Sequence, residues 1–254
     1  MNRATTGRKP TTPWLVGRRT PAEAGLTLYC FAHSGGSPGE FLRWADELPG
    51  ATLRGVQLPG RGSHAGAAAL TTLPEVLDGV LDQVDFTPPF AFFGHSMGGL
   101  LAYETARRIV ARGGAGPRFL VISSCAPPHH PRDEGLRDLP DAELLTAIDE
   151  RYGGGVPTEL LLDETVRTLL MRSFRADVSV SETYRPTPGP VPDCPLYVMG
   201  GSHDLDPGLL SEWARYTTGP SRTTVVEGGH FYLRDAPGRR ALLALLNGLI
   251  ASAG

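Results

Sequence analysis

Residues 92–99 are Phe92-Phe93-Gly94-His95-Ser96-Met97-Gly98-Gly99, which contain the pattern Gly-x-Ser-x-Gly. The apolar run 90–93 suits a buried parallel strand, and residues 100–110 have the composition of a helix. Glycines on both sides of the serine remove the Cβ atoms that would collide in a tight turn. The stretch therefore predicts a strand, a sharp turn and a helix, with the Ser96 hydroxyl exposed at the top of a sheet. A serine in an ordinary glycine-rich turn is the alternative, which the flanking strand and helix patterns disfavour.

Strand and helix patterns alternate along most of the chain. Further apolar strand patterns occur at residues 26–32, 51–57, 119–125, 196–199 and 223–226. Helical patterns occur at residues 41–48, 73–84, 207–216 and 236–251. Because this alternation is typical of parallel strands joined by helical crossovers, we expect an α/β fold with a mostly parallel central sheet and helices on both faces.

The alternation stops between residues 126 and 195. This segment has no clear strand pattern, but residues 141–152 and 163–179 are helical in character. Since the segment leaves the strand that follows the serine turn, we expect a helical lid, inserted at residues 127–190 of a single domain formed by residues 13–254. The alternative is that the two helices only thicken one face of the core. Residues 1–12 are polar and basic, and we expect a mobile tail there.

The overall composition excludes several classes of function. The formal net charge of −3 favours neither nucleic acid nor an anionic membrane as a partner. Residues 1–19 are polar and basic without a long apolar run, so we expect neither a signal peptide nor a membrane span there. The 3 cysteines are far apart in apolar surroundings, so we expect free thiols in a cytoplasmic protein. The 7 histidines have no ligand set around them, so we expect no metal.

Two loops after the last strand patterns carry residues that suit nucleophilic catalysis. A serine hydroxyl needs a base to take its proton, and the base needs a group that orients it. His230 follows the last strand pattern, and Asp204 follows the one before it. The order serine, acid, histidine is that of the α/β-hydrolases, so the sequence predicts a catalytic triad of Ser96, Asp204 and His230. Asp206 is the alternative acid, and we favour Asp204 because it is the first acid after a pair of glycines.

A serine nucleophile that attacks an acyl group also needs N–H donors for the developing oxyanion. One donor is the N–H of the residue after the nucleophile, Met97. The second is expected in the loop after an early strand, which here is His33-Ser34-Gly35-Gly36. Its glycines free the backbone to point N–H groups inward. We expect the Ser34 N–H to be this donor, and the alternatives are the Gly35 N–H or a turn without this role.

Five sequence blocks occur in order across nearly the whole chain. They are Phe31-Ala32-His33-Ser34-Gly35-Gly36-Ser37, Gln57-Leu58-Pro59-Gly60-Arg61, Phe93-Gly94-His95-Ser96-Met97-Gly98-Gly99, Gly200-Gly201-Ser202-His203-Asp204 and Gly228-Gly229-His230-Phe231-Tyr232. In this combination the chain resembles the type II thioesterases of polyketide and nonribosomal peptide synthesis. The resemblance implies a free-standing α/β-hydrolase with a helical lid, a triad of Ser96, Asp204 and His230, and oxyanion donors at Ser34 and Met97.

The resemblance also implies a function. Such enzymes hydrolyse acyl groups from the phosphopantetheine arms of carrier proteins, often to clear misprimed or stalled chains. We therefore expect an acyl or peptidyl carrier protein as partner, no cofactor and a monomeric enzyme. The alternatives are a small-molecule carboxylesterase with the same triad and a catalytically idle module that binds carrier proteins. The chain departs from the family at Gly62-Ser63-His64, where a further arginine commonly follows Arg61.

Overall fold

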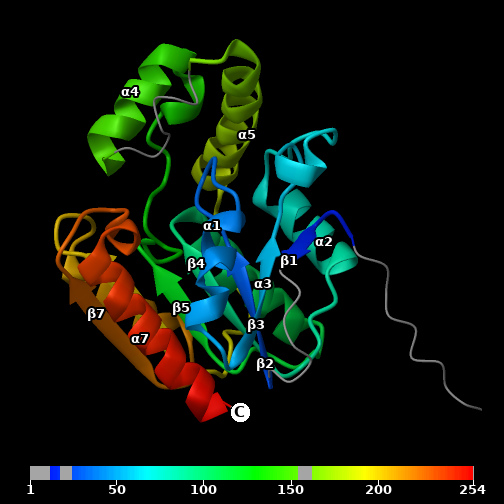
Figure 1. Ribbon diagram of the computed structural model, residues 1–254, viewed down its shortest axis with the longest axis vertical. Coiled ribbons are helices and arrows are strands. Elements are labelled where there is room, and N and C mark those ends of the chain that lie inside the picture. Colours follow the sequence, from blue (N-terminus) through cyan, green and yellow to red (C-terminus); the bar gives the residue numbers. More distant parts are fainter. Residues whose placement is uncertain (1–11, 18–24, 154–161, 254) are drawn as a thin grey trace, which may run out of the picture.

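The computed structural model describes residues 12–17, 25–153 and 162–253, so the predicted tail lies outside the described residues except for Thr12. Its centre is a 7-stranded sheet with the strand order β1-β3-β2-β4-β5-β6-β7 (Figure 1). The strands are β1 (Leu15–Gly17), β2 (Leu26–Phe31), β3 (Ala51–Val56), β4 (Phe90–His95), β5 (Leu120–Ser123), β6 (Leu196–Gly201) and β7 (Ser221–Val226). β1 is antiparallel to β3, and the other pairings of this sheet are parallel. The predicted α/β fold is confirmed.

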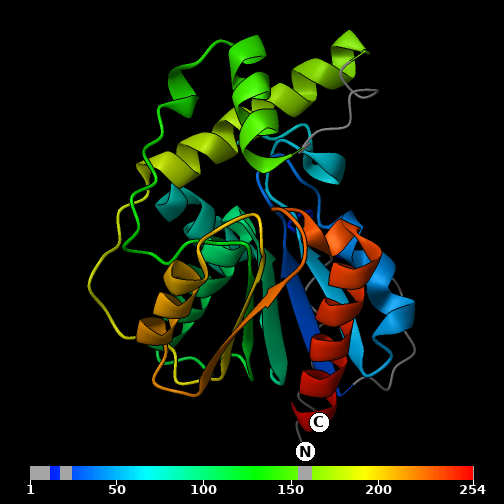
Figure 2. The same cartoon turned by 90° about the vertical axis from the view of Figure 1, so that its left-hand side faces the viewer.

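Helices cover both faces of the sheet, as the sequence predicts (Figure 2). One face is covered by α2 (Leu73–Gln83), α3 (Met97–Ala111) and α6 (Pro207–Ser211). The other face is covered by α1 (Gly39–Leu42) and α7 (Ala236–Ala253). The patterns at 41–48 and 207–216 each form a short α-helix that continues as a 3-10 turn, η1 (Arg43–Glu47) and η5 (Glu212–Tyr216).

Strand β4 shows why the apolar run before the serine is continuous. Phe90 and Phe92 pack into the hydrophobic cluster on the α2 and α3 side, whereas Ala91 and Phe93 pack into the cluster on the α7 side. Successive side chains of a strand point to opposite faces, so a strand buried on both faces is apolar at every position. The strand therefore holds the turn at Ser96 on a support that is packed from two sides.

A cap stands over the carboxyl ends of the strands (Figure 1). It consists of η3 (Leu136–Asp138), α4 (Asp141–Tyr152) and α5 (Glu164–Thr183). Its own hydrophobic cluster is formed by Leu136, Leu144, Ile148, Met171, Phe174 and Val178. Glu182 is buried near the end of α5 and accepts hydrogen bonds from the backbone N–H groups of Glu134, Leu136 and Arg137. This carboxylate ties the chain that enters the cap to the helix that leaves it.

Helix α5 passes from the cap into the core. Its middle contributes Phe174 and Val178 to the cap cluster. Two residues further on, Val180 packs into the core cluster on the α2 and α3 side, and Tyr184 after the end of the helix does the same. A single helix therefore joins the two parts of the molecule.

The cysteines and helices have the properties that the composition indicates. Cys30, Cys125 and Cys194 are buried free thiols. Burial raises the pKa of each thiol above its ordinary value. Among the helices of the described ranges, none is long and apolar enough to cross a bilayer.

Candidate active site

Ser96 occupies a sharp turn between β4 and α3. Its backbone angles are φ 55° and ψ −125°, a conformation that residues with a side chain rarely adopt. Its N–H donates to the carbonyl oxygen of Ser123 at 2.8 Å, which anchors the turn to β5. A Cβ at Gly94 would lie 2.1 Å from the Gly98 carbonyl oxygen, and a Cβ at Gly98 would lie 2.1 Å from the Phe31 carbonyl oxygen. Both glycines of the sequence pattern are therefore required by close backbone packing.

His230 and Asp204 form a buried pair in the loops after β7 and β6. His230 Nδ1 lies 2.9 Å from Asp204 Oδ1, and each side chain is 6% exposed. An ionised carboxylate only accepts hydrogen bonds, so the shared proton belongs to Nδ1 and Nε2 keeps its lone pair. Asp204 Oδ2 is buried without a hydrogen-bond partner among the described residues, so the side-chain hydrogen bond that the structure gives this carboxylate is the one to His230.

The alternative acid, Asp206, has a different partner. Its Oδ1 accepts from the Leu209 N–H at 3.1 Å and caps the N-terminus of α6. The loop of Asp204 instead packs directly on the loop of His230, because a Cβ at Gly201 would lie 2.2 Å from the Gly229 carbonyl oxygen. The geometry therefore favours Asp204 as the residue that orients His230.

The loop after β2 distinguishes the two candidate oxyanion donors. The Gly35 N–H donates to the carboxylate of Asp177 at 2.7 Å and is therefore occupied. The N–H groups of Ser34 and Met97 make no hydrogen bond to any other residue that the structure describes. Both residues line the same cavity as Ser96. The Ser34 N–H, unlike the Gly35 N–H, is thus available to donate a hydrogen bond to an oxygen that becomes negative at this site.

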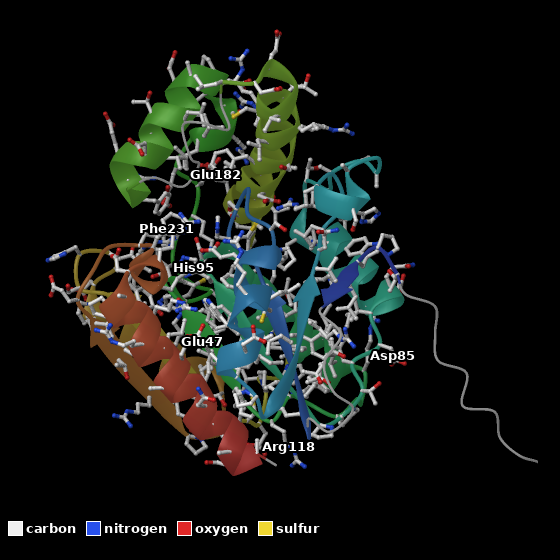
Figure 3. All side chains as sticks on the ribbon, viewed as in Figure 1. Glu47, Asp85, His95, Arg118, Glu182 and Phe231 are labelled. Carbon is white, nitrogen blue, oxygen red and sulfur yellow. The ribbon has the colours of Figure 1, made fainter. Side chains whose placement is uncertain are left out.

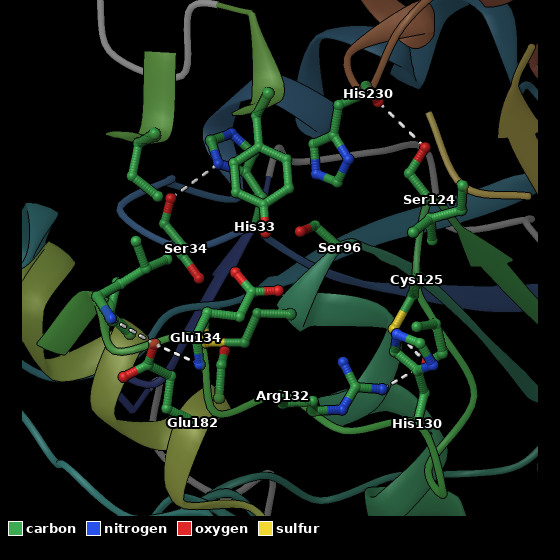
Figure 4. A pocket seen from close by; sticks show the side chains of 18 of the residues that line it. His33, Ser34, Ser96, Ser124, Cys125, His130, Arg132, Glu134, Glu182 and His230 are labelled. Carbon is green, nitrogen blue, oxygen red and sulfur yellow. Dashed lines mark hydrogen bonds between the residues drawn. The ribbon is translucent and has the colours of Figure 1, made fainter. Parts of the chain in front are cut away.

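A cavity of about 150 Å³ lies between these loops and the cap. Figure 4 shows the Ser96 hydroxyl and the His230 ring facing the same space. The apolar residues that the cap contributes to its wall are Leu136, Ile148, Tyr152, Phe174 and Val178. Besides His33 and His230, its wall includes the side chains of His130, Arg132, Glu134 and Glu182, together with the Cys125 thiol and the Tyr152 hydroxyl group. The cavity therefore combines a serine, a histidine and free N–H donors with a mainly apolar ceiling.

Comparison with known proteins decides the family. The model of the thioesterase domain family matches residues 26–248. The chain belongs to the thioesterase family. It is 32% identical to Thioesterase PikA5 of Streptomyces venezuelae over 231 residues, which cover 87% of this chain and 80% of that protein. It is 29% identical to the gramicidin S biosynthesis protein GrsT of Aneurinibacillus migulanus, with 88% of this chain and 89% of that protein covered.

Solved structures give the same result. The RedJ thioesterase from the prodiginine biosynthetic pathway in Streptomyces coelicolor superposes with a TM-score of 0.83 at 32% identity, covering 91% of this chain and 90% of that chain. The type II thioesterase BorB from the borrelidin biosynthetic cluster gives a TM-score of 0.82 at 28% identity, covering 93% and 97%. These findings confirm that the five sequence blocks identify a type II thioesterase of polyketide and nonribosomal peptide synthesis.

The thioesterase supports His230 from below with a second, neutral histidine. His95 is fully buried, and its Nδ1 lies 2.9 Å from Ser123 Oγ, which in turn lies 2.8 Å from the Tyr232 hydroxyl. Burial, with a further contribution from neighbouring cationic groups, lowers the pKa of His95 well below its ordinary value. Its ring lies 5.1 Å from that of His230, at the junction of sheet and cap where Figure 3 also labels Phe231. A neutral ring at this position packs against His230 without placing a positive charge beside it.

Two residues of the thioesterase cap contact the site in a way that the sequence did not predict. The Tyr152 ring at the end of α4 lies 4.5 Å from the His230 ring, centroid to centroid. Asp177 of α5 binds the loop that carries Ser34, through the Gly35 N–H. Helical periodicity places both residues on predicted helices, but it does not show which core residue each one contacts.

Proposed function

We propose that this thioesterase hydrolyses acyl groups from the phosphopantetheine arm of acyl or peptidyl carrier proteins, with Ser96 as nucleophile, His230 as base and Asp204 as orienting acid. The observation that carries the proposal is the buried His230–Asp204 pair, whose free Nε2 belongs to a ring that lines the same cavity as Ser96. The biosynthetic pathways named for GrsT, RedJ and BorB support a carrier-bound substrate.

The reaction follows from the positions of these groups. Ser96 Oγ attacks the thioester carbonyl carbon while His230 Nε2 takes the proton of the Ser96 hydroxyl. The carbonyl oxygen becomes negative and accepts hydrogen bonds from the N–H groups of Ser34 and Met97. When the carbon–sulfur bond breaks, Nε2 returns the proton to the pantetheine sulfur and an acyl-serine ester remains. Nε2 then takes a proton from water, whose oxygen attacks the ester carbon. When the bond from that carbon to Ser96 Oγ breaks, Nε2 gives the proton to Oγ, which releases the acid and restores Ser96. Asp204 stabilises the imidazolium in both steps.

The size of the cavity limits the acyl group. A cavity of about 150 Å³ holds one molecule of about the size of benzene. We therefore expect a short acyl chain, of about six carbons, to fit inside the cavity with the cap in this position. As part of this proposal residues 13–254 form one domain, the cap serves as the lid, and the enzyme acts as a cytoplasmic monomer.

A comparison of two substrates and one covalent probe tests the proposal. We expect butyryl-carrier protein to be hydrolysed with a higher kcat/KM than p-nitrophenyl butyrate, and a fluorophosphonate to label Ser96. A preference for the simple ester would indicate a carboxylesterase. Absence of both labelling and turnover would indicate a module that binds carrier proteins without catalysis.

A further inference from the structure

A buried ion pair joins the cap to the loop that follows β3. Arg61 Nη1 and Nη2 donate to Asp177 Oδ2 and Oδ1 at 2.7 and 2.6 Å, so the guanidinium and carboxylate meet in a two-pronged contact. The Asp177 side chain is 1% exposed and that of Arg61 is 9% exposed. Removing two charges from water is costly, and buried pairs of this kind are weak evidence for stability alone. The pair therefore calls for a second role.

The same two side chains hold the loop that carries Ser34. Asp177 Oδ2 accepts the Gly35 N–H at 2.7 Å, and Arg61 Nη1 donates to the Gly36 carbonyl oxygen at 3.2 Å. Phe174, one turn earlier on α5, covers the loop so closely that a Cβ at Gly35 would lie 2.7 Å from its ring. The loop is thus bound through its N–H and its carbonyl groups by residues that α5 positions.

These contacts fix the peptide plane next to the proposed oxyanion donor. The plane between Ser34 and Gly35 is held at its N–H by Asp177 and at its carbonyl oxygen by His33 Nδ1, which lies 2.9 Å away. Gly35 has φ 71°, a conformation in which the chain turns back and the Gly36 N–H reaches the His33 carbonyl oxygen at 2.9 Å. The Ser34 N–H shares its peptide plane with this His33 carbonyl, so the bond from Gly36 limits the direction of the Ser34 N–H as well.

We propose that Asp177, held by Arg61, is a positioning residue that sets the Ser34 N–H for the oxyanion when α5 is seated on the core. The proposal rests on the proposed roles of Ser96 and Ser34 in acyl transfer. It makes the cap more than a wall: seating α5 orders the donor that stabilises the transition state. A substrate that lifts α5 would bind without being turned over efficiently.

The experiment compares Asp177→Ala with Glu104→Ala. Glu104→Ala is the matched control, because Glu104 also belongs to a buried ion pair. Arg107 Nη1 donates to both of its carboxylate oxygens at 2.9 Å, and this contact does not involve the loop of Ser34. We expect Asp177→Ala to lower kcat for p-nitrophenyl butyrate about 10²-fold with little change in KM, as for loss of an oxyanion donor. Affinity for butylboronic acid, whose tetrahedral serine adduct places an oxygen at the oxyanion site, should fall by a similar factor. Glu104→Ala should lower the unfolding temperature but neither of these two quantities.

If Asp177→Ala does not fold, the isosteric Asp177→Asn and the charge-conserving Arg61→Lys are measured in its place. Asp177→Asn retains an oxygen for the Gly35 N–H and loses the ion pair, so we expect a smaller loss of about tenfold in kcat and in boronate affinity. Unchanged kcat and boronate affinity in the folded Asp177 variants, or equal losses in Glu104→Ala, would overturn the proposal. Both readouts use small molecules, so failure to hydrolyse acyl-carrier protein would reject the proposed substrate and leave this test intact.

Discussion

The two walls of the cavity rest on different supports. The core wall carries Ser96, Met97 and His230 on loops of a sheet that is packed on both faces. The cap wall carries Ile148 and Phe174, which belong to a small separate cluster. Exact positions for reacting atoms require locked surroundings, whereas an apolar wall needs only shape. We therefore expect the core wall to supply the reacting groups and the apolar residues of the cap wall to decide which acyl group is accepted.

The largest expected effect separates a core serine from a cap serine. Ser96→Ala removes the nucleophile and should lower kcat about 10⁶-fold on every acyl thioester, whatever the chain length. Ser181 lines the same cavity from α5, and Ser181→Ala is the matched control, with kcat expected near that of the parent enzyme. Single-turnover hydrolysis of acyl-carrier protein measures both. A comparable loss in the two variants would refute the assignment of chemistry to the core wall.

The second prediction separates the two acids of the loop after β6. Asp204→Asn removes the charge that holds His230 in the productive tautomer and should lower kcat up to about 10⁴-fold. Asp206→Asn should have little effect, because asparagine caps a helix about as well as aspartate does. Steady-state kinetics of the two variants give the ranking. The reverse order would transfer the orienting role to Asp206.

The third prediction concerns the cap wall. Ile148→Trp fills part of the cavity and should exclude about two methylene groups, each worth about 0.8 kcal/mol on burial. The ratio of kcat/KM for acetyl over hexanoyl thioesters should therefore rise about tenfold, while labelling of Ser96 by a small fluorophosphonate stays close to that of the parent. Leu169→Trp is the control, since Leu169 belongs to the same cap but is 43% exposed. An unchanged ratio in Ile148→Trp would show that the cap does not select chain length.

Local signals allowed much of the core wall to be predicted. The serine turn, the order of the strands in the sequence and the pairing of the loops of Asp204 and His230 follow from glycine positions and apolar runs within a few residues. Strand β1 was not predicted, because its three residues, Leu15–Gly17, are too few to show the alternation of a strand. The sequence favours Ser34 over Gly35 as oxyanion donor, but the contact that occupies the Gly35 N–H depends on Asp177, far along the chain.

The cap contacts had no such signal. Asp177 meets Arg61 across 116 positions of sequence, and its place on a predicted helix did not reveal a buried partner. Tyr152 ends a helix whose bounds the sequence predicts correctly, yet its contact with His230 depends on how α4 lies over the sheet. Periodicity gives the face of a helix, and the crossing of helix over core decides what that face touches.

The backbone of Ser96 has a consequence for how this enzyme balances stability against activity. Its angles, φ 55° and ψ −125°, are the mirror image of ordinary extended backbone, which glycine adopts without strain and serine does not. Compared with Ser96→Ala, Ser96→Gly relieves about 1–3 kcal/mol of strain and gives back a few tenths to 1 kcal/mol through the freer unfolded chain. Urea unfolding should therefore find the glycine variant more stable by about 1 kcal/mol. The inactive Ser96→Gly variant would then be more stable than a variant with a side chain at this position. The enzyme therefore keeps its nucleophile at a cost in folding stability.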